Sequence, residues 1–166
     1  MIGNGWRRRT SAIGLASSIA VLGVVAPVAA GTPVGVHIVS HMDFNQDTFN
    51  TGDFVASGPA VDDGTFCAAG VVEDTRIILA GGQSGRGLQI PVRKTFTCEV
   101  GGTGQIFVKI QVHLDFATST ETFSWVILGG TGDFADLHGS GQGTTVSDGS
   151  DPQTGNFNTY DGFVVD

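Results

Sequence analysis

The stretch from Trp125 to Gly143 reads W-V-I-L-G-G-T-G-D-F-A-D-L-H-G-S-G-Q-G and carries the strongest indication of the fold. A short apolar run ends at a Gly-Gly-Thr-Gly sequence, and glycine then recurs at positions 139, 141 and 143. Glycine at alternate positions of a strand leaves one face without side chains, so another group must lie close against that face or the strand must bend. Both occur in a small closed sheet, because its strands coil tightly around a crowded interior. The stretch therefore predicts a barrel strand, a corner and the next strand.

The rest of the chain also alternates between apolar and polar residues, and no window keeps a helical period. The clearest pair of strands is 88–98 and 106–116, which a Gly-Gly-Thr-Gly turn joins into a predicted β-hairpin. Further strands are predicted at about 33–44, 53–57, 65–73, 75–80, 121–128, 138–146 and 157–165. Eight or nine regularly spaced strands, with at most one helical turn at 133–137, indicate a sandwich or a barrel. The glycine-rich strand and strand lengths near ten residues favour an all-β fold, a small antiparallel eight-stranded closed β-barrel.

The N-terminus has the pattern of a secretory signal peptide. Arg7, Arg8 and Arg9 precede an apolar stretch of small residues over 12–25, and Val28-Ala29-Ala30 fits a cleavage site. The apolar stretch is shorter than the roughly 20 residues that a membrane span needs. We therefore expect residues 1–30 to be removed, and residues 31–166 to form a single secreted domain that is not held in a membrane.

The chain is acidic, with sixteen Asp and Glu residues against eight Lys and Arg and a net charge of −8. Removal of residues 1–30 takes away three basic residues and no acidic ones, which makes the charge −11. Nucleic acids and anionic membranes require a cationic surface. The overall charge therefore argues against both as partners.

Cys67 and Cys98 are the only cysteines. A single pair in an exported chain predicts a disulfide, and neither cysteine has the C-x-x-C context of a redox site. Closing a loop of this length stabilises the folded state by about 3–4 kcal/mol in the chain-entropy model.

The segment 129–141, G-G-T-G-D-F-A-D-L-H-G-S-G, resembles the allene oxide cyclase/dirigent-like barrel superfamily, and most closely its uncharacterised exported actinobacterial members. Lys94–Cys98 and Asn158–Gly162 are similar to the same relatives, so the resemblance spans about 64–165. It implies an eight-stranded antiparallel barrel with an apolar cavity. Characterised relatives include cyclases, isomerases, cycloaddition enzymes and dirigent proteins, which bind reactive apolar intermediates. The motif itself carries over no catalytic residue.

The alternation along each predicted strand indicates which side chains face the lumen of the barrel. Met42, Lys94, Phe116 and Trp125 are predicted to line a ligand cavity, although Met and aromatic residues in such phases also build ordinary cores. Glu121 shares a face with Phe123 and Trp125, so it is a weak candidate for a proton-transferring group near one mouth of the barrel. The alternative for Glu121 is a solvated acid at a strand end.

No metal or cofactor is predicted. His37, His41 and Asp43 share the outward face of the first strand, where the two histidines lie too far apart to share one ion. Asp43-x-Asn45-x-Asp47 matches the opening of a calcium loop, but the glycine and glutamate that an EF-hand needs at later positions are missing. A loose calcium site and an ordinary acidic loop both stay open.

Three functions are compatible with these features: a secreted barrel that binds a small apolar molecule, a cofactor-free cyclase or isomerase that acts in the lumen, and a structural barrel with a fully packed core. A lumen larger than about 300 Å³ favours the first two. Phe66, Val72 and Phe107 are predicted on the outer face, where they could build an oligomer.

Overall fold

The computed structural model describes residues 31–44, 49–78, 87–149 and 155–166. Eight antiparallel strands form a closed barrel in which each strand pairs with its neighbours in the chain, and the last pairs with the first. The strands are β1 (Val34–Asp43), β2 (Thr51–Ser57), β3 (Ala69–Ile77), β4 (Gly87–Val100), β5 (Gly104–Asp115), β6 (Thr120–Gly130), β7 (His138–Ser147) and β8 (Gly155–Val165). The predicted eight-stranded closed barrel is confirmed.

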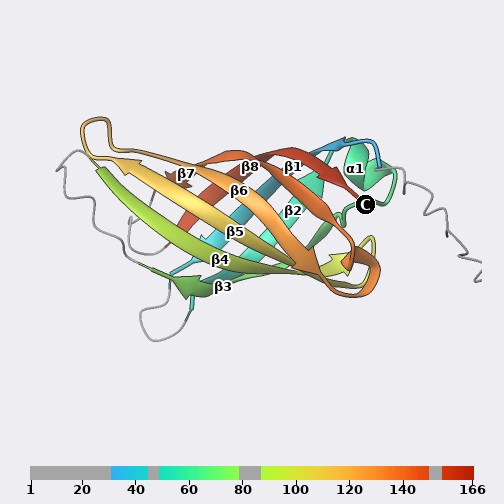
Figure 1. Cartoon of the computed structure of the whole chain (residues 1–166). Helices are drawn as coiled ribbons and strands as arrows, with labels where there is room; N and C mark the ends of the chain where they lie inside the picture. The colour runs from blue at the N-terminus through green and yellow to red at the C-terminus, as the bar shows by residue number, and fades with distance from the viewer. Residues whose placement is uncertain (1–30, 45–48, 79–86, 150–154) are drawn as a thin grey trace, which may run out of the picture.

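The two ends of the barrel differ in how the strands are connected. At one end, the closed end, lie the short helix α1 (Pro59–Asp62), the turn 101–103, the 3-10 turn η1 (Gly132–Phe134) and the C-terminus. At the other end, the open end, β1, β3, β5 and β7 end, β2, β4, β6 and β8 begin, and the described turn 116–119 joins β5 to β6 (Figure 1). Three further connections run between these strand ends. Of these, 45–48, 79–86 and 150–154 are outside the described residues.

The glycines of β7 face the barrel interior, and aromatic rings lie directly against them. A Cβ on Gly141 would lie 2.7 Å from the Trp125 ring, and one on Gly143 would collide with the Phe123 ring. These rings fill the space that the missing side chains leave, as the alternate glycines predicted. Any larger residue at either position would have to displace an aromatic ring and the backbone of β8.

An aromatic layer crosses the middle of the lumen. Phe96 contacts Phe54 and Tyr160 edge to face, with ring centroids 5.1 and 5.7 Å apart, and Tyr160 contacts Phe123 at 4.8 Å. Edge-to-face pairs at these separations are favourable. From this layer to the closed end the lumen is filled by buried apolar side chains, including Leu137.

The predicted disulfide is present at the closed end. Cys67 and Cys98 are bonded and buried, with their Cα atoms 5.9 Å apart. The bond joins the segment that follows α1 to the end of β4. It therefore fastens the chain where it crosses the closed end.

The third strand differs from the prediction. The structure has a single strand, β3, where two strands at 65–73 and 75–80 were predicted, because a register shift between Asp74 and Arg76 interrupts the alternation without ending the strand. The prediction that Phe66 and Val72 face outward is wrong, since both are buried. Phe66 precedes β3, in the segment that crosses the closed end. Its backbone N–H donates to the Ala60 carbonyl oxygen.

Residues 1–30, in which the signal peptide is predicted, lie outside the described residues. Within the described ranges, no helix has the length and apolar character needed to cross a membrane.

Phe107 faces outward and is half-buried, as its phase in β5 predicted.

Candidate functional site

The half of the lumen next to the open end contains a pocket of about 210 Å³. Its lining combines eight apolar and six polar side chains: Met42, Phe44, Ile77, Ile90, Val92, Ile110, Val112 and Phe123, and Asn50, Asp74, Lys94, Glu121, Asn156 and Asn158. Phe123 belongs both to this lining and to the aromatic layer. The pocket therefore ends where the packed half of the lumen begins.

A buried ion pair lies in the pocket wall. Lys94 of β4 and Asp74 of β3 are cross-strand neighbours, and the Lys94 ammonium donates to Asp74 Oδ1 at 2.5 Å. The two side chains are only 8% and 6% exposed. Asn50 donates to the other carboxylate oxygen, at 2.9 Å. Both oxygens of Asp74 thus have a donor, which a buried carboxylate requires.

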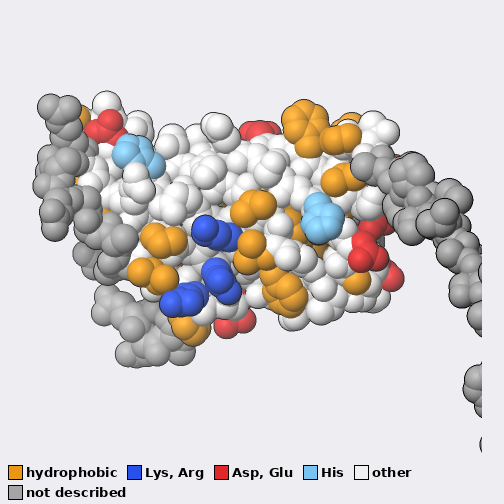
Figure 2. All heavy atoms as spheres, viewed as in Figure 1, with side chains coloured by type: hydrophobic (Ala, Val, Ile, Leu, Met, Phe, Trp, Pro, Cys, Tyr) orange, Lys and Arg blue, Asp and Glu red, His pale blue; other side chains and the backbone are white. Residues whose placement is uncertain are grey.

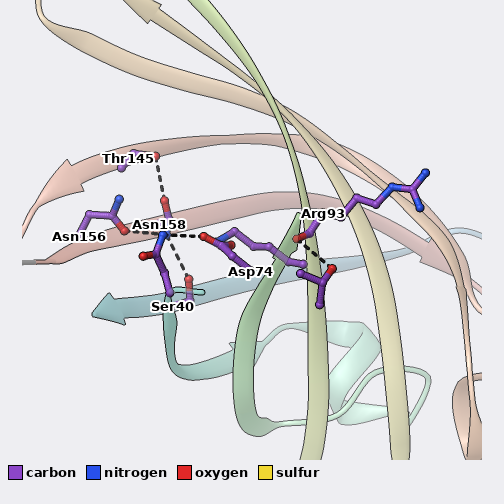
Figure 3. Close-up of polar contacts among 9 residues, drawn as sticks. Ser40, Asp74, Arg93, Thr145, Asn156 and Asn158 are labelled. Carbon is purple, nitrogen blue, oxygen red and sulfur yellow. Dashed lines mark hydrogen bonds and ion pairs between the residues drawn. The ribbon is translucent and has the colours of Figure 1, made fainter. Parts of the chain in front are cut away.

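Asn158 of β8 connects the strands on the other side of the pocket. Its amide nitrogen donates to the Asn156 side chain at 3.0 Å and to the Ser40 hydroxyl at 3.5 Å, while its oxygen accepts from Thr145 at 2.8 Å (Figure 3). These bonds join β1, β7 and β8. A network with its groups paired in this way fixes the orientation of the amide, so the polar wall of the pocket is preorganised.

Glu121 on β6 lines the same pocket and is the second carboxylate in the pocket lining, after Asp74. Its cross-strand neighbours, Leu114 on β5 and Thr145 on β7, are both uncharged. Among the described residues no ion pair or hydrogen bond of the Glu121 side chain is found, in contrast to Asp74. Within the described ranges, the Glu121 carboxylate thus lines the pocket without a protein partner.

Tyr160, the only tyrosine, lies buried in the aromatic layer. Its hydroxyl has no hydrogen-bond partner of good geometry among the described residues, although Ser40 is its polar neighbour. Burial raises the pKa of the phenol, which stays neutral at physiological pH. Tyr160 is thus part of the floor beneath the pocket and supplies no charge.

The structure brings three of the predicted site residues together and leaves two elsewhere. Met42, Lys94 and Glu121 all line the pocket. Phe116 does not, because it lies beyond the end of β5 and is 54% exposed. Trp125 is buried against Gly141 and Gly162 outside the pocket lining, and its indole N–H donates to the Gln142 carbonyl at 3.2 Å. Neither Phe116 nor Trp125 therefore lines this pocket.

Sequence reasoning missed Asp74, Asn158 and Ser40. Asn158 and Ser40 have the same phase as apolar core residues of their own strands, and a polar residue in a core phase indicates a buried polar site. Asp74 fell between the predicted strands 65–73 and 75–80, although in β3 it has the same phase as the buried Val72.

No metal centre emerges from the described ranges, in which no three His, Cys, Asp or Glu side chains converge. His37 is on the outer face, where its ring pairs with Asp161 at 2.7 Å. His41 stacks on Phe157 with ring centroids 4.5 Å apart. Asp43 is exposed, and Asn45 and Asp47 of the suggested calcium loop lie outside the described residues.

Comparison of the sequence with models of known protein families finds no match, and comparison with curated proteins finds none either. Fold and site therefore define the class by themselves. The chain is an eight-stranded antiparallel barrel with one packed half and one half that holds a pocket.

Proposed function

We propose that the protein is an exported barrel of the allene oxide cyclase/dirigent-like kind that binds a small, mainly apolar molecule in its lumen. The observation that carries this proposal is the unequal filling of the lumen. Among the described residues, buried aromatic and aliphatic side chains pack one half, whereas the other half leaves about 210 Å³ beside apolar walls. A barrel with a purely structural role has no need for such a space, because unfilled core volume lowers stability.

The size of the pocket limits its ligand. Pockets for drug-sized ligands measure about 300–1,000 Å³. At about 210 Å³ this pocket falls below that range, and below the volume of about 300 Å³ expected from the sequence for a lumen that holds such a ligand. A cavity of about 150 Å³ is enough for benzene. The expected ligand is therefore about as large as one substituted ring, with its apolar part against Ile110, Val112 and Phe123 and a polar group toward Glu121 or Lys94.

A second candidate function, a cofactor-free isomerase or cyclase, is favoured by one observation: a carboxylate with no partner among the described residues and a buried ammonium group line the same small pocket. Glu121 would accept a proton from the bound molecule, and the Lys94 ammonium would stabilise negative charge that develops on an oxygen. Orientation and exclusion of water would supply the rest of the acceleration.

The test is recovery of the bound molecule. The protein is purified without denaturation, its small molecules are extracted and identified by mass spectrometry, and two variants are treated in the same way. Val112→Trp fills the pocket, whereas Gln111→Trp adds the same side chain on the outer face of the same strand. We expect a molecule from the wild type and from Gln111→Trp but not from Val112→Trp.

Each other outcome decides between the candidates. Equal recovery from both variants, with both folded, places the molecule outside the lumen and contradicts the proposal. A wild-type protein that carries nothing and binds no ring-sized probe fits the packed structural barrel. Conversion of the recovered molecule by the wild type but not by Glu121→Gln, with binding retained, establishes the enzyme.

A further inference from the structure

Three of the four Lys and Arg side chains in the described residues form a single row on the outside of the barrel. Arg76 on β3 pairs in register with Arg93 on β4, and Arg93 pairs with Lys109 on β5. All three are exposed. The fourth, Lys94, points the opposite way and is bound to Asp74. We call Arg76, Arg93 and Lys109 the basic row.

The basic row is visible on the surface. Figure 2 shows the Lys and Arg side chains of this face gathered over β3–β5, in the half nearer the open end, with hydrophobic side chains beside them. Arg93 points away from the polar cluster of the lumen (Figure 3). The row borders a depression of about 230 Å³ whose other lining residues are Ile78, Pro91 and Val92.

The basic row has no counter-charge among the residues that the structure describes. No salt bridge joins any of its members to a carboxylate within the described ranges, although the whole chain has twice as many acidic as basic residues. Glu73, on the same outer face of β3, is opposite Thr95, the next outward position of β4, and is not paired with the row. Like charges directly opposite one another destabilise a sheet. An arrangement of this kind is stabilised when an anion binds across it.

We propose that the basic row binds an acidic polysaccharide through successive carboxylates. Neighbouring strands are about 4.8 Å apart, so the row offers cations at that interval across three strands. A linear polyuronate carries one carboxylate on every sugar and so presents a regular series of anions to such a row. Arginine forks match carboxylates with two parallel hydrogen bonds, and exposed Ile78 and half-buried Pro91 offer an apolar surface to the sugar rings.

The acidic remainder of the protein selects among polyanions. A net charge of −8 repels a densely charged partner such as duplex DNA, whereas a polyuronate with one charge per sugar can contact the row alone. The site lies on the outer face, so it acts independently of any ligand in the lumen.

The experiment is a titration of the purified protein with a short oligogalacturonate, and with its methyl ester as the uncharged control, followed by calorimetry at low salt. We expect binding of the acid that weakens steadily with added salt, and no binding of the ester. Arg93→Gln should weaken binding by about tenfold, since a charge-assisted contact at the centre of the row is lost. Thr144→Glu changes the net charge equally on exposed β7 and should have little effect.

Four results would overturn the proposal. They are equal binding of acid and ester, equal effects of Arg93→Gln and Thr144→Glu, tighter binding of a sulfated oligosaccharide or of duplex DNA than of the polyuronate, and no binding of the acid at low salt. Circular dichroism of the variants shows that they are folded, and both substitutions are at exposed positions where folding is not at risk.

Discussion

The two ends of this barrel are built from the same eight strands but in different ways. The closed end is covered by α1, a glycine turn and η1, is fastened by the Cys67–Cys98 disulfide and is packed with apolar side chains. The open end places a buried ion pair, an asparagine network and the Glu121 carboxylate, which has no partner in the described part of the chain, around a pocket. The comparison indicates that the closed half stabilises the barrel, whereas the open half holds the pocket proposed above as a binding site.

If the open half keeps its polar groups at a cost to stability, the ion pair should be the most sensitive point there. Replacing Lys94 by Met leaves the buried Asp74 carboxylate with Asn50 as its remaining donor. We expect the free energy of unfolding, measured by urea denaturation, to fall by about 3–5 kcal/mol.

The matched control is the double variant Lys94→Met with Asp74→Leu, which removes both charges. It should recover most of the loss, because apolar replacement of a whole buried pair is often neutral. A loss below about 1 kcal/mol in the single variant would instead class the pair with solvated surface bridges.

The closed half should be most sensitive to added volume. A Cβ on Gly141 would collide with the Asp161 carbonyl and lie 2.7 Å from the Trp125 ring. Gly141→Ala is therefore expected to lower the free energy of unfolding by about 1–3 kcal/mol, as in other overpacked cores. Gly35→Ala is the control, since a Cβ there meets no atom within 4 Å. Equal melting temperatures for the two variants would contradict the packing described for β7.

The aromatic layer between the two halves can be examined through Tyr160 alone, because the chain has no other tyrosine. Burial raises the pKa of this phenol in the folded protein above the value of about 10 that an unfolded chain has. The folded state thus holds its proton more tightly, and its stability is retained below pH 10 and decreases as the pH rises further.

Ultraviolet absorbance at increasing pH measures the phenolate directly, and circular dichroism reports folding in the same samples. Ionisation should occur only as the barrel unfolds. A phenolate that appears near pH 10 in a protein that is still folded would show that water reaches the layer.

Much of this division could be predicted from the sequence. The glycines at 139, 141 and 143, the hairpin of 88–98 with 106–116 and the inward phase of Lys94 all follow from alternation, which depends only on the geometry of a strand. Local alternation does not specify how strands are staggered around a closed sheet. For that reason it did not distinguish Trp125, in the packed region, from Met42, at the pocket, and it placed Phe116 in a lumen that the side chain does not reach.

The partner of Lys94 and the basic row depend on pairing between strands, which the sequence does not display. The register shift after Asp74 places Arg76 opposite Arg93, and the hairpin places Lys109 beside them. Net charge alone suggested that the protein has no cationic surface, because it sums the charges of the whole chain. The strand register instead gathers three positive charges at one place on the barrel.

The most direct test of the two-halves account is a methyl NMR titration with benzyl alcohol, a neutral probe of about the size of the pocket. The account predicts shifts for Met42, Ile110 and Val112, which line the pocket, and none for Ile106, Leu137 and Val164 of the packed region. Shifts spread equally over both sets, or shifts confined to methyl groups on the outer face, or no shift at saturating probe would contradict it.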